Sequence, residues 1–260
     1  MSNTIKLTRN AQVATIYLNR PEAFNSFNRE MALAFLDQLE ACDQDPEIRV
    51  IIISGEGKAF CAGQDLKEVL DPESMIGFER LVDEHYNAII KKITQLNTPV
   101  IASVNGVAAG AGANIALACD IVIASESASF IQAFSKIGLI PDSAGTYILP
   151  RLIGFQKAKA IAMLGDKVDA ASAEKMGMIY KAVPHENLQD EVEKVAGKLA
   201  ALPPLGILYT KKLFTESMGN TMEQQLELEK KYQIMAGNTE DYNECVNAFV
   251  EKRKPIIKGK

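Results

Sequence analysis

The chain has 260 residues, of which 47% are hydrophobic and 23% charged, a composition typical of a globular protein with one large domain. Its 28 Lys and Arg against 33 Asp and Glu give a net charge of −5, which disfavours non-specific binding to nucleic acid or to an anionic membrane. No apolar run reaches the ~18 residues of a membrane span. Residues 1–12 contain no apolar targeting core, so we expect no export signal and a cytoplasmic location.

The first half of the chain alternates between strand-like and helix-like segments. β-branched apolar runs predict strands over residues 13–18, 50–53, 99–104 and 120–125, and residues 136–140 are also strand-like. Between the first two strands, Met31, Phe35, Leu39 and Cys42 recur at helical spacing, with Asn28 as the cap. A further helix is expected over about residues 74–96. Strands that alternate with helices predict an α/β fold.

After about residue 156 the pattern becomes helical. Six segments have helical periodicity: residues 156–164, 172–177, 186–202, 205–218, 221–236 and 240–253. Only residues 178–183 are strand-like. Such amphipathic helices need a covering surface, so we expect them to pack on the core and on neighbouring subunits. We place the division at residue 200, with a core over 1–200 and a helical oligomerisation region over 201–260.

Few residues are available for metal or histidine chemistry. The four cysteines, Cys42, Cys61, Cys119 and Cys245, are far apart and have no metal-site spacing, so we expect free thiols and no metal site. Cys61 has no histidine base near it, and we interpret it as a packing residue. The two histidines, His85 and His185, lie in charged helical segments, and we expect both on the surface.

Two segments rich in small residues each follow a strand and open a helix. In SGEGKAFCAGQDL, residues 54–66, a corner without bulky side chains is able to aim the N–H of Gln64 at a ligand. In NGVAAGAGANIALACD, residues 105–120, Gly110 precedes a helix that we expect to begin near Asn114, and the N–H of Ala111 is placed to bind an oxyanion or a phosphate.

Other interpretations of these segments stay open. The glycines near residue 110 lack the GxGxxG spacing of a dinucleotide site, but they also suit close packing of a helix on a strand. The first segment is equally compatible with an ordinary loop. Two corners that each offer one backbone donor nevertheless match what an oxyanion hole for an acyl thioester requires.

The motifs FCAGQDL, SVNGVAAGAGANIALACDIVIAS and IGLIPDSAGT, in this order and spacing, resemble the crotonase (enoyl-CoA hydratase/isomerase) superfamily over essentially the whole chain. The resemblance implies a spiral core of repeated β-β-α units and a C-terminal helical trimerisation region, assembled as a homotrimer or a dimer of trimers. It places the two oxyanion donors at Gln64 and Ala111. It also implies that the coenzyme A part of the substrate lies along Ala23, Ala62, Asp65, Leu66 and Lys67. No separate cofactor is expected.

The same resemblance bears on which reaction is expected. Hydratases of the family carry two glutamates at the positions of Asn114 and Phe134, and neither Asn nor Phe is able to act as a general base. The remaining ionisable group is Asp142, in the turn of the motif IGLIPDSAGT. The resemblance implies a catalytic carboxylate at or near this turn, because related isomerases have one there. Asp142 also suits a helix cap or an Asx turn. With Gly110, Asn114 and Phe134 around the acyl group, the resemblance favours an isomerase acting on 3-enoyl or ring-epoxide thioesters.

Three alternatives remain at this point. A hydratase using Asp142 with an unidentified partner would add water to an enoyl thioester. A displacement mechanism would use Asp142 as a nucleophile and form a covalent adduct. A non-catalytic member would bind acyl-CoA without turning it over. The sequence leaves the acyl group undefined.

Overall fold

A computed structural model describes residues 3–260, so the first two residues of the N-terminal segment and of the predicted core lie outside it. The larger sheet has the order β1-β2-β3-β5-β7-β10 and is parallel except for the β1–β2 pair. Its strands are β1 (Ile5–Asn10), β2 (Val13–Leu18), β3 (Val50–Gly55), β5 (Val100–Val104), β7 (Ile121–Ser125) and β10 (Lys181–Val183).

A second, smaller sheet has the order β4-β6-β8-β9, in which β4, β6 and β8 are parallel and β9 is antiparallel to β8. Its strands are β4 (Ala59–Cys61), β6 (Val107–Ala109), β8 (Ser129–Ile131) and β9 (Lys167–Asp169). Three times in succession the chain passes from a strand of the large sheet to one of the small sheet and then into helices. These β-β-α repeats confirm the expected α/β spiral.

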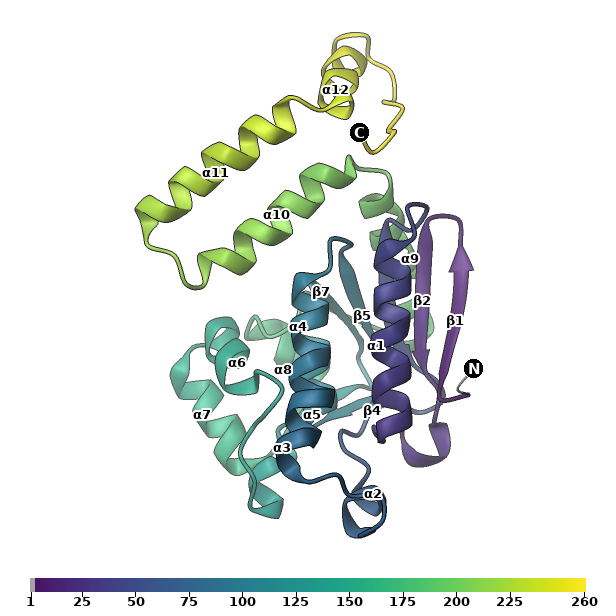
Figure 1. The fold of residues 1–260 in the computed structure, drawn as a ribbon, viewed down its shortest axis with the longest axis vertical. Coiled ribbons are helices and arrows are strands. Elements are labelled where there is room, and N and C mark those ends of the chain that lie inside the picture. Colours follow the sequence, from purple (N-terminus) through teal and green to yellow (C-terminus); the bar gives the residue numbers. More distant parts are fainter. Residues whose placement is uncertain (1–2) are drawn as a thin grey trace.

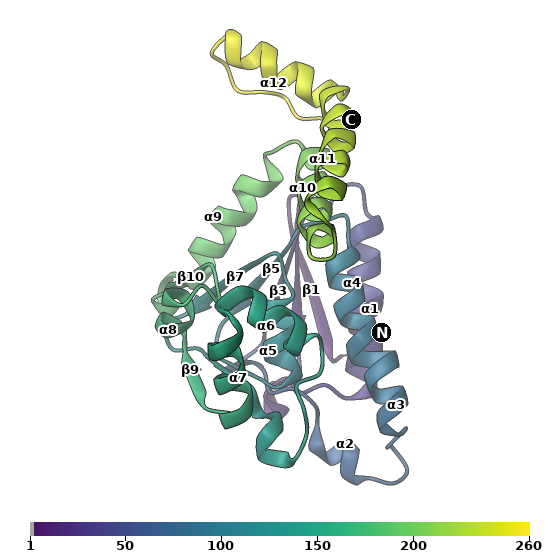
Figure 2. The same ribbon diagram turned by 90° about the vertical axis from the view of Figure 1, so that its left-hand side faces the viewer.

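Helices cover both faces of the large sheet, as Figures 1 and 2 show: α1 and α4 stand side by side on one face and α9 on the other. The helices of the core are α1 (Arg29–Gln44), α2 (Leu66–Leu70), α3 (Phe78–Arg80), a π-helical turn η2 (Leu81–Asn87), α4 (Ala88–Gln95), α5 (Ala111–Leu117), α6 (Gly145–Ile153), α7 (Phe155–Leu164), α8 (Ala170–Lys175) and α9 (Leu188–Ala200). The chain also forms 3₁₀ turns η1 (Pro21–Ala23), η3 (Ala133–Ile137) and η4 (His185–Asn187).

The capping and burial predicted for α1 are confirmed. The side chain of Asn28 accepts a hydrogen bond from the N–H of Met31, which satisfies one of the free donors at the helix start. The predicted apolar stripe of this helix, from Met31 to Cys42, is buried against the sheet. All four cysteines are free thiols.

Several expectations from the sequence were wrong. Residues 136–140 are not a strand: the 3₁₀ turn η3 ends at Gly138, and Ile137 and Ile140 lie 56% and 79% exposed without a strand partner. The strand expected over 178–183 is formed only by Lys181–Val183. The helix expected from Asn114 begins three residues earlier, at Ala111, because Gly110 is already its non-helical cap.

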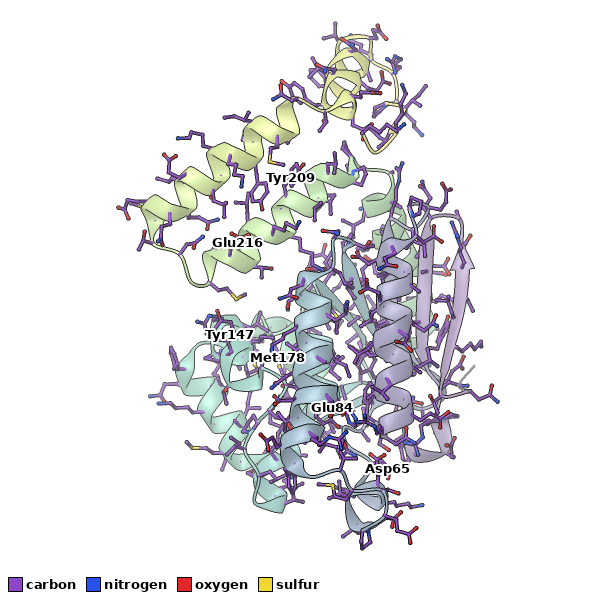
Figure 3. All side chains as sticks on the ribbon, viewed as in Figure 1. Asp65, Glu84, Tyr147, Met178, Tyr209 and Glu216 are labelled. Atoms are coloured by element: carbon purple, nitrogen blue, oxygen red, sulfur yellow. The ribbon has the colours of Figure 1, made fainter. Side chains whose placement is uncertain are left out.

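The C-terminal helices α10 (Pro204–Ser217), α11 (Met222–Gly237) and α12 (Glu240–Val250) extend beyond one end of the sheet (Figures 1 and 2). Each of the six segments predicted as helical after residue 156 contains a helix, although α8 ends at Lys175 and α12 at Val250, before the predicted ends. Tyr209 of α10 and Tyr232 of α11 stack with ring centroids 5.0 Å apart, on the side of α10 that faces α11 (Figure 3). None of the helices within residues 3–260 combines the length and the apolarity that crossing a bilayer requires.

A buried lysine ties α10 to the core. Lys211 Nζ lies 2.8 Å from the carboxylate of Asp120 and donates to the carbonyl oxygens of Ile93 and Thr98, so its three donors are all used. Asp120 also accepts a hydrogen bond from the N–H of Val100 at the start of β5. One ammonium group therefore joins α10 to α4 and, through Asp120, to the start of β5 inside the large sheet.

We expect Lys211→Met to lower the free energy of unfolding by about 3 kcal/mol, because it leaves the partly buried Asp120 carboxylate without its cation and removes the ammonium donor from two carbonyl oxygens. Denaturant unfolding of wild type and variant measures this loss. Lys212→Met is the matched control, since the ammonium of Lys212 makes no ion pair within the described chain. Equal losses in the two variants would contradict the role given to Lys211.

Candidate active site

The candidate site lies where the three parallel strands of the small sheet end. Because β4, β6 and β8 are neighbours and run in the same direction, their carboxyl ends meet at one edge, which is where ligands bind in open α/β sheets. The segments that leave this edge are residues 62–65, 110–111 and 132–144. They contain the predicted donors Gln64 and Ala111 and the predicted carboxylate of Asp142.

The first two corners touch at Gly63. This residue has φ +91°, and a Cβ atom built on it would lie 2.9 Å from Ala109 O and 3.5 Å from Ala111 N. A side chain here would therefore press on the backbone that follows β6 and would be strained by the backbone conformation. Glycine at 63 allows the two corners to come into contact.

Each corner presents a free backbone donor. Phe27 forms an isolated parallel bridge with Gln64, in which it uses the C=O of Gly63 and the N–H of Asp65. Because successive peptides of an extended chain face opposite ways, the N–H of Gln64 points away from Phe27. Ala111 is the first residue of α5, where helical N–H groups have no intrahelical acceptor. Within residues 3–260 neither N–H has a hydrogen-bond partner.

The third corner carries the carboxylate. Asp142 is half-buried at the turn before α6, and Ser143 Oγ donates a hydrogen bond of 2.8 Å to its Oδ1. Burial raises the pKa of Asp142 above its usual value, and the hydrogen bond from Ser143 offsets part of the rise. A carboxylate with a raised pKa is a stronger base, which suits it to accept a proton from carbon.

Asn114 holds the turn that contains Asp142. Its Nδ2 donates to the backbone oxygen of Asp142 at 2.8 Å, and its Oδ1 accepts from Gln132 Nε2 at 2.8 Å. A Cβ atom at Gly145 would lie only 2.4 Å from Asn114 Nδ2, so α6 approaches this amide as closely as a glycine permits. Both ends of the 1%-exposed Asn114 amide are therefore occupied by the protein. Gln132 was not found from the sequence.

The other two side chains expected near the oxyanion donors, Phe134 and Cys61, carry no group that is able to act as a base or a nucleophile. Phe134 is buried, with its Cζ 3.8 Å from where a Cβ of Gly110 would lie. Cys61 is fully buried, and burial raises the pKa of its thiol to about 12, so it stays protonated and is a poor nucleophile. No group of three or more His, Cys, Asp or Glu side chains in the described part of the chain is arranged to hold a metal ion.

The residues predicted to contact coenzyme A form a rim beside the first corner. Ala62, Leu66 and Lys67 are exposed, and Ala23 and Asp65 are partly so. The N–H of Ala62 donates to Phe24 O at 3.0 Å, which holds the turn containing Ala23 against this corner.

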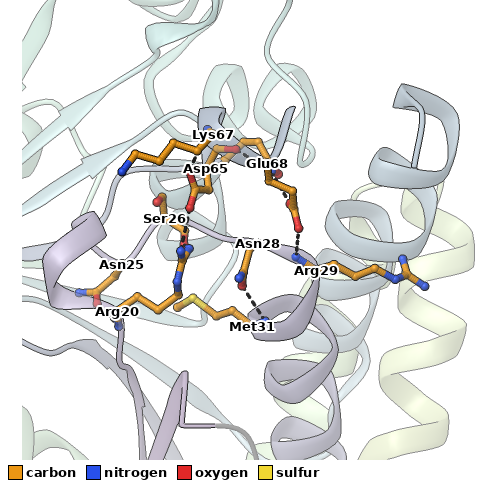
Figure 4. Close-up of polar contacts among 10 residues, drawn as sticks. Arg20, Asn25, Ser26, Asn28, Arg29, Met31, Asp65, Lys67 and Glu68 are labelled. Atoms are coloured by element: carbon orange, nitrogen blue, oxygen red, sulfur yellow. Dashed lines mark hydrogen bonds and ion pairs between the residues drawn. The ribbon is translucent and has the colours of Figure 1, made fainter. Parts of the chain in front are cut away.

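Asp65 has a structural role within this rim. It caps α2 through the N–H of Lys67 and forms an ion pair of 2.7 Å with Arg20 (Figure 4), while Figure 3 places it beside α2. Its carboxylate is therefore engaged within the protein, and the exposed backbone and side chains on either side remain open to a ligand.

Two neighbouring residues, His85 and Tyr86, are buried although the sequence did not indicate it. His85, expected on the surface, is 1% exposed, because the π-helical turn η2 directs it into the core, whereas His185 is exposed as expected. Its neighbour Tyr86 is equally buried and donates a hydrogen bond of 2.6 Å to Gln64 Oε1. Neither position belongs to a local motif, so no signal in the sequence indicated their burial.

An α/β spiral with two free backbone donors and one carboxylate at a sheet edge has the features that an acyl-thioester site requires, and comparison with known proteins identifies the family. The family model for enoyl-CoA hydratase/isomerase matches residues 8–260. The 1,2-epoxyphenylacetyl-CoA isomerase of Escherichia coli is 44% identical over 252 residues, covering 95% of both chains. A probable enoyl-CoA hydratase of Rhodobacter capsulatus is 39% identical, covering 99% of both.

Solved structures show the same fold. Enoyl-CoA hydratase from Bacillus anthracis superimposes with a TM-score of 0.92 at 32% identity, covering 99% of this chain and 100% of the other. The chain belongs to the enoyl-CoA hydratase/isomerase (crotonase) family of enzymes.

We expect Asp142→Asn to leave the free energy of unfolding unchanged or higher near neutral pH. Because the folded-state pKa of Asp142 is raised, the ionised carboxylate costs stability above that pKa, and this cost disappears as pH falls below the unfolded value of 3.8. The advantage of the variant should therefore grow as pH rises from 3.8 to the folded-state pKa and stay constant above it, as denaturant titrations at several pH values measure. A variant that is less stable near pH 7 would contradict this assignment.

Proposed function

We propose that the protein is an acyl-CoA isomerase in which the N–H groups of Gln64 and Ala111 bind the thioester oxygen and Asp142 moves the proton. The observation that supports this most is the contact of the two corners at Gly63, which brings both free donors to the edge where Asp142 lies. Two donors on one oxygen stabilise the negative charge that develops when a proton leaves the neighbouring carbon.

For a 3-enoyl thioester the steps balance with a single acid/base. The carboxylate of Asp142 takes a proton from C2, and the electron pair spreads over C2 to C4 and onto the oxygen held by the two donors. The resulting carboxylic acid returns the proton to C4, which leaves the double bond between C2 and C3. No water enters, and no cofactor is needed beyond the coenzyme A that the substrate carries.

The side chains near the oxyanion donors favour isomerisation over hydration. Adding water requires groups that hold the water and transfer its protons. At the two positions where family hydratases carry glutamates, the chain has Phe134, which is apolar, and Asn114, whose amide is already bonded to Gln132 and to the Asp142 turn. The 44% identity to an isomerase of 1,2-epoxyphenylacetyl-CoA supports ring-epoxide thioesters, which would be converted to the oxepin form, as a second substrate class.

We also propose that the chain works as a homotrimer or a dimer of trimers, through the region 201–260. Its helices carry apolar side chains that the protein leaves exposed, among them Phe214 (72%), Met222 (72%) and Phe249 (85%). Large apolar side chains left exposed in one region of a chain are typical of an interface. The rim from Ala62 to Lys67, with Ala23, is proposed to bind the coenzyme A moiety.

The direct test is a screen of enoyl-, dienoyl- and ring-epoxide-CoA thioesters with wild type and Asp142→Asn. We expect wild type to isomerise a 3-enoyl or epoxide substrate and to leave crotonyl-CoA unhydrated, and the variant to lose roughly 10³-fold in kcat. Near-full turnover by the variant would contradict the assignment. Hydration of crotonyl-CoA would support the hydratase alternative, and tight binding with no turnover a non-catalytic role.

The pH dependence of kcat/KM follows from the same carboxylate. Because the base must be ionised and burial raises the pKa of Asp142, activity should be full above that pKa and fall as pH decreases through it, at a pH above 3.8. Initial rates with a 3-enoyl-CoA across the stable pH range measure this limb. A Ser143→Ala variant, which removes the hydrogen bond that lowers this pKa, should shift the limb upward; an unchanged limb would contradict Asp142 as the base.

A further inference from the structure

The side chain of Gln64 is held at both ends. Its Oε1 accepts the 2.6 Å hydrogen bond from Tyr86, and its Nε2 donates to Glu68 Oε2 at 2.9 Å. An amide with one strong acceptor contact and one charge-assisted donor contact has little rotational freedom left.

Glu68 is in turn fixed to the start of α1. Its second oxygen accepts from the backbone N–H of Arg29 at 2.8 Å, a position where a helix start favours a negative charge (Figure 4). The guanidinium of Arg29 lies 3.1 Å from His85 Nε2 and forms an ion pair of 2.6 Å with Glu84. Because His85 is bonded directly to Tyr86 along the chain, the contacts form a closed loop that starts and ends at Gln64.

We name this closed set the Gln64 ring; its members are Gln64, Glu68, Arg29, His85 and Tyr86. They come from three segments that are far apart in the sequence: the corner with α2, the start of α1, and the π-helical turn η2. π-Helical turns are uncommon and occur often at functional sites.

Tyr86 is the buried end of the ring. It is 1% exposed, and its ring packs edge-on against Phe27, the residue that bridges to Gln64, at a centroid distance of 6.5 Å. Burial, with smaller electrostatic contributions from Cys61, Asp142 and Glu68, raises the pKa of Tyr86 well above its usual value. The phenol therefore stays protonated and acts as a donor at every working pH.

We infer that Tyr86, acting through the Gln64 ring, is a positioning residue that fixes the direction of the Gln64 N–H toward the thioester oxygen. The φ angle of Gln64 sets the direction of its N–H relative to its side chain. The Gly63–Gln64 peptide is already held at its C=O by the 2.7 Å hydrogen bond from the Phe27 N–H, and the side-chain contacts of Gln64 add a second restraint on the same unit. Holding the side-chain amide at both ends therefore restrains the N–H. This inference rests on the proposed oxyanion hole, in which that N–H is one of two donors.

The test is Tyr86→Phe, which removes one oxygen and keeps the packed ring. With a 3-enoyl- or epoxide-CoA substrate, we expect kcat to fall about tenfold with KM within about twofold, because a misdirected donor weakens binding of the transition state more than of the substrate. The acid limb of the pH profile should not move, since Asp142 keeps its own partners. Tyr180→Phe, which alters a 63%-exposed tyrosine, is the matched control and should behave as wild type.

A second readout does not depend on turnover. Infrared difference spectra of bound butanoyl-CoA labelled with ¹³C at the thioester carbonyl report how strongly the two donors polarise that bond. We expect a lowered carbonyl frequency in wild type and a smaller lowering in Tyr86→Phe. In a Gln64→Met background, where the side-chain acceptor is absent, Tyr86→Phe should add no further change to kcat or to the frequency.

The outcomes separate the two proposals. Wild-type kcat and carbonyl frequency in a folded Tyr86→Phe variant would overturn the inference, as would a full additional loss in the Gln64→Met background. A wild-type protein that polarises the carbonyl but turns over no thioester would contradict the proposed isomerase activity alone. An unpolarised carbonyl in bound wild type would contradict the oxyanion hole, and the inference would fail with it.

Discussion

The parallel alignment of β4, β6 and β8 is the constraint on which the rest of the site depends. Three strands of three residues each end at one edge, so the segments that follow them have to share the space beyond it. Gly63 lets the first two segments touch, and the third returns through a turn fixed by Asn114. The small sheet rests on the large one where β4 contacts β3 and β5.

In the proposed site, backbone N–H groups stabilise negative charge and a side chain transfers the proton. Backbone N–H groups carry fixed partial positive charge without any ionisable group, so the contribution of the proposed oxyanion hole should not depend on pH while the fold persists. In the proposed mechanism the side chain of Asp142 transfers the proton, and its partial burial raises the pKa of the carboxyl group at some cost in stability. The amide of Asn114 bonds the backbone of Asp142 and the side chain of Gln132, and so fixes the turn that carries the proposed base.

Local sequence patterns predicted the features that depend on local geometry. The strand-to-helix corners followed from small residues after apolar runs, and the cap at Asn28 from its position before an apolar stripe. The three-residue strands of the small sheet were too short to show a period, and their pairing is a tertiary property. The burial of Tyr86 and His85 depends on a π-helical turn and on partners up to 56 residues away, so no window of sequence contained it. The apolar run near Ile140 was misjudged because exposed and buried apolar segments have the same composition.

The most direct measurement is a crystal structure of the inactive Asp142→Asn variant with a bound 3-enoyl-CoA. We predict that the thioester oxygen lies about 3 Å from both the Gln64 and Ala111 nitrogens, and that C2 lies about 3.5 Å from the side chain at position 142. A thioester oxygen bound by neither nitrogen, or a C2 atom beyond reach of position 142, would contradict the proposed mechanism.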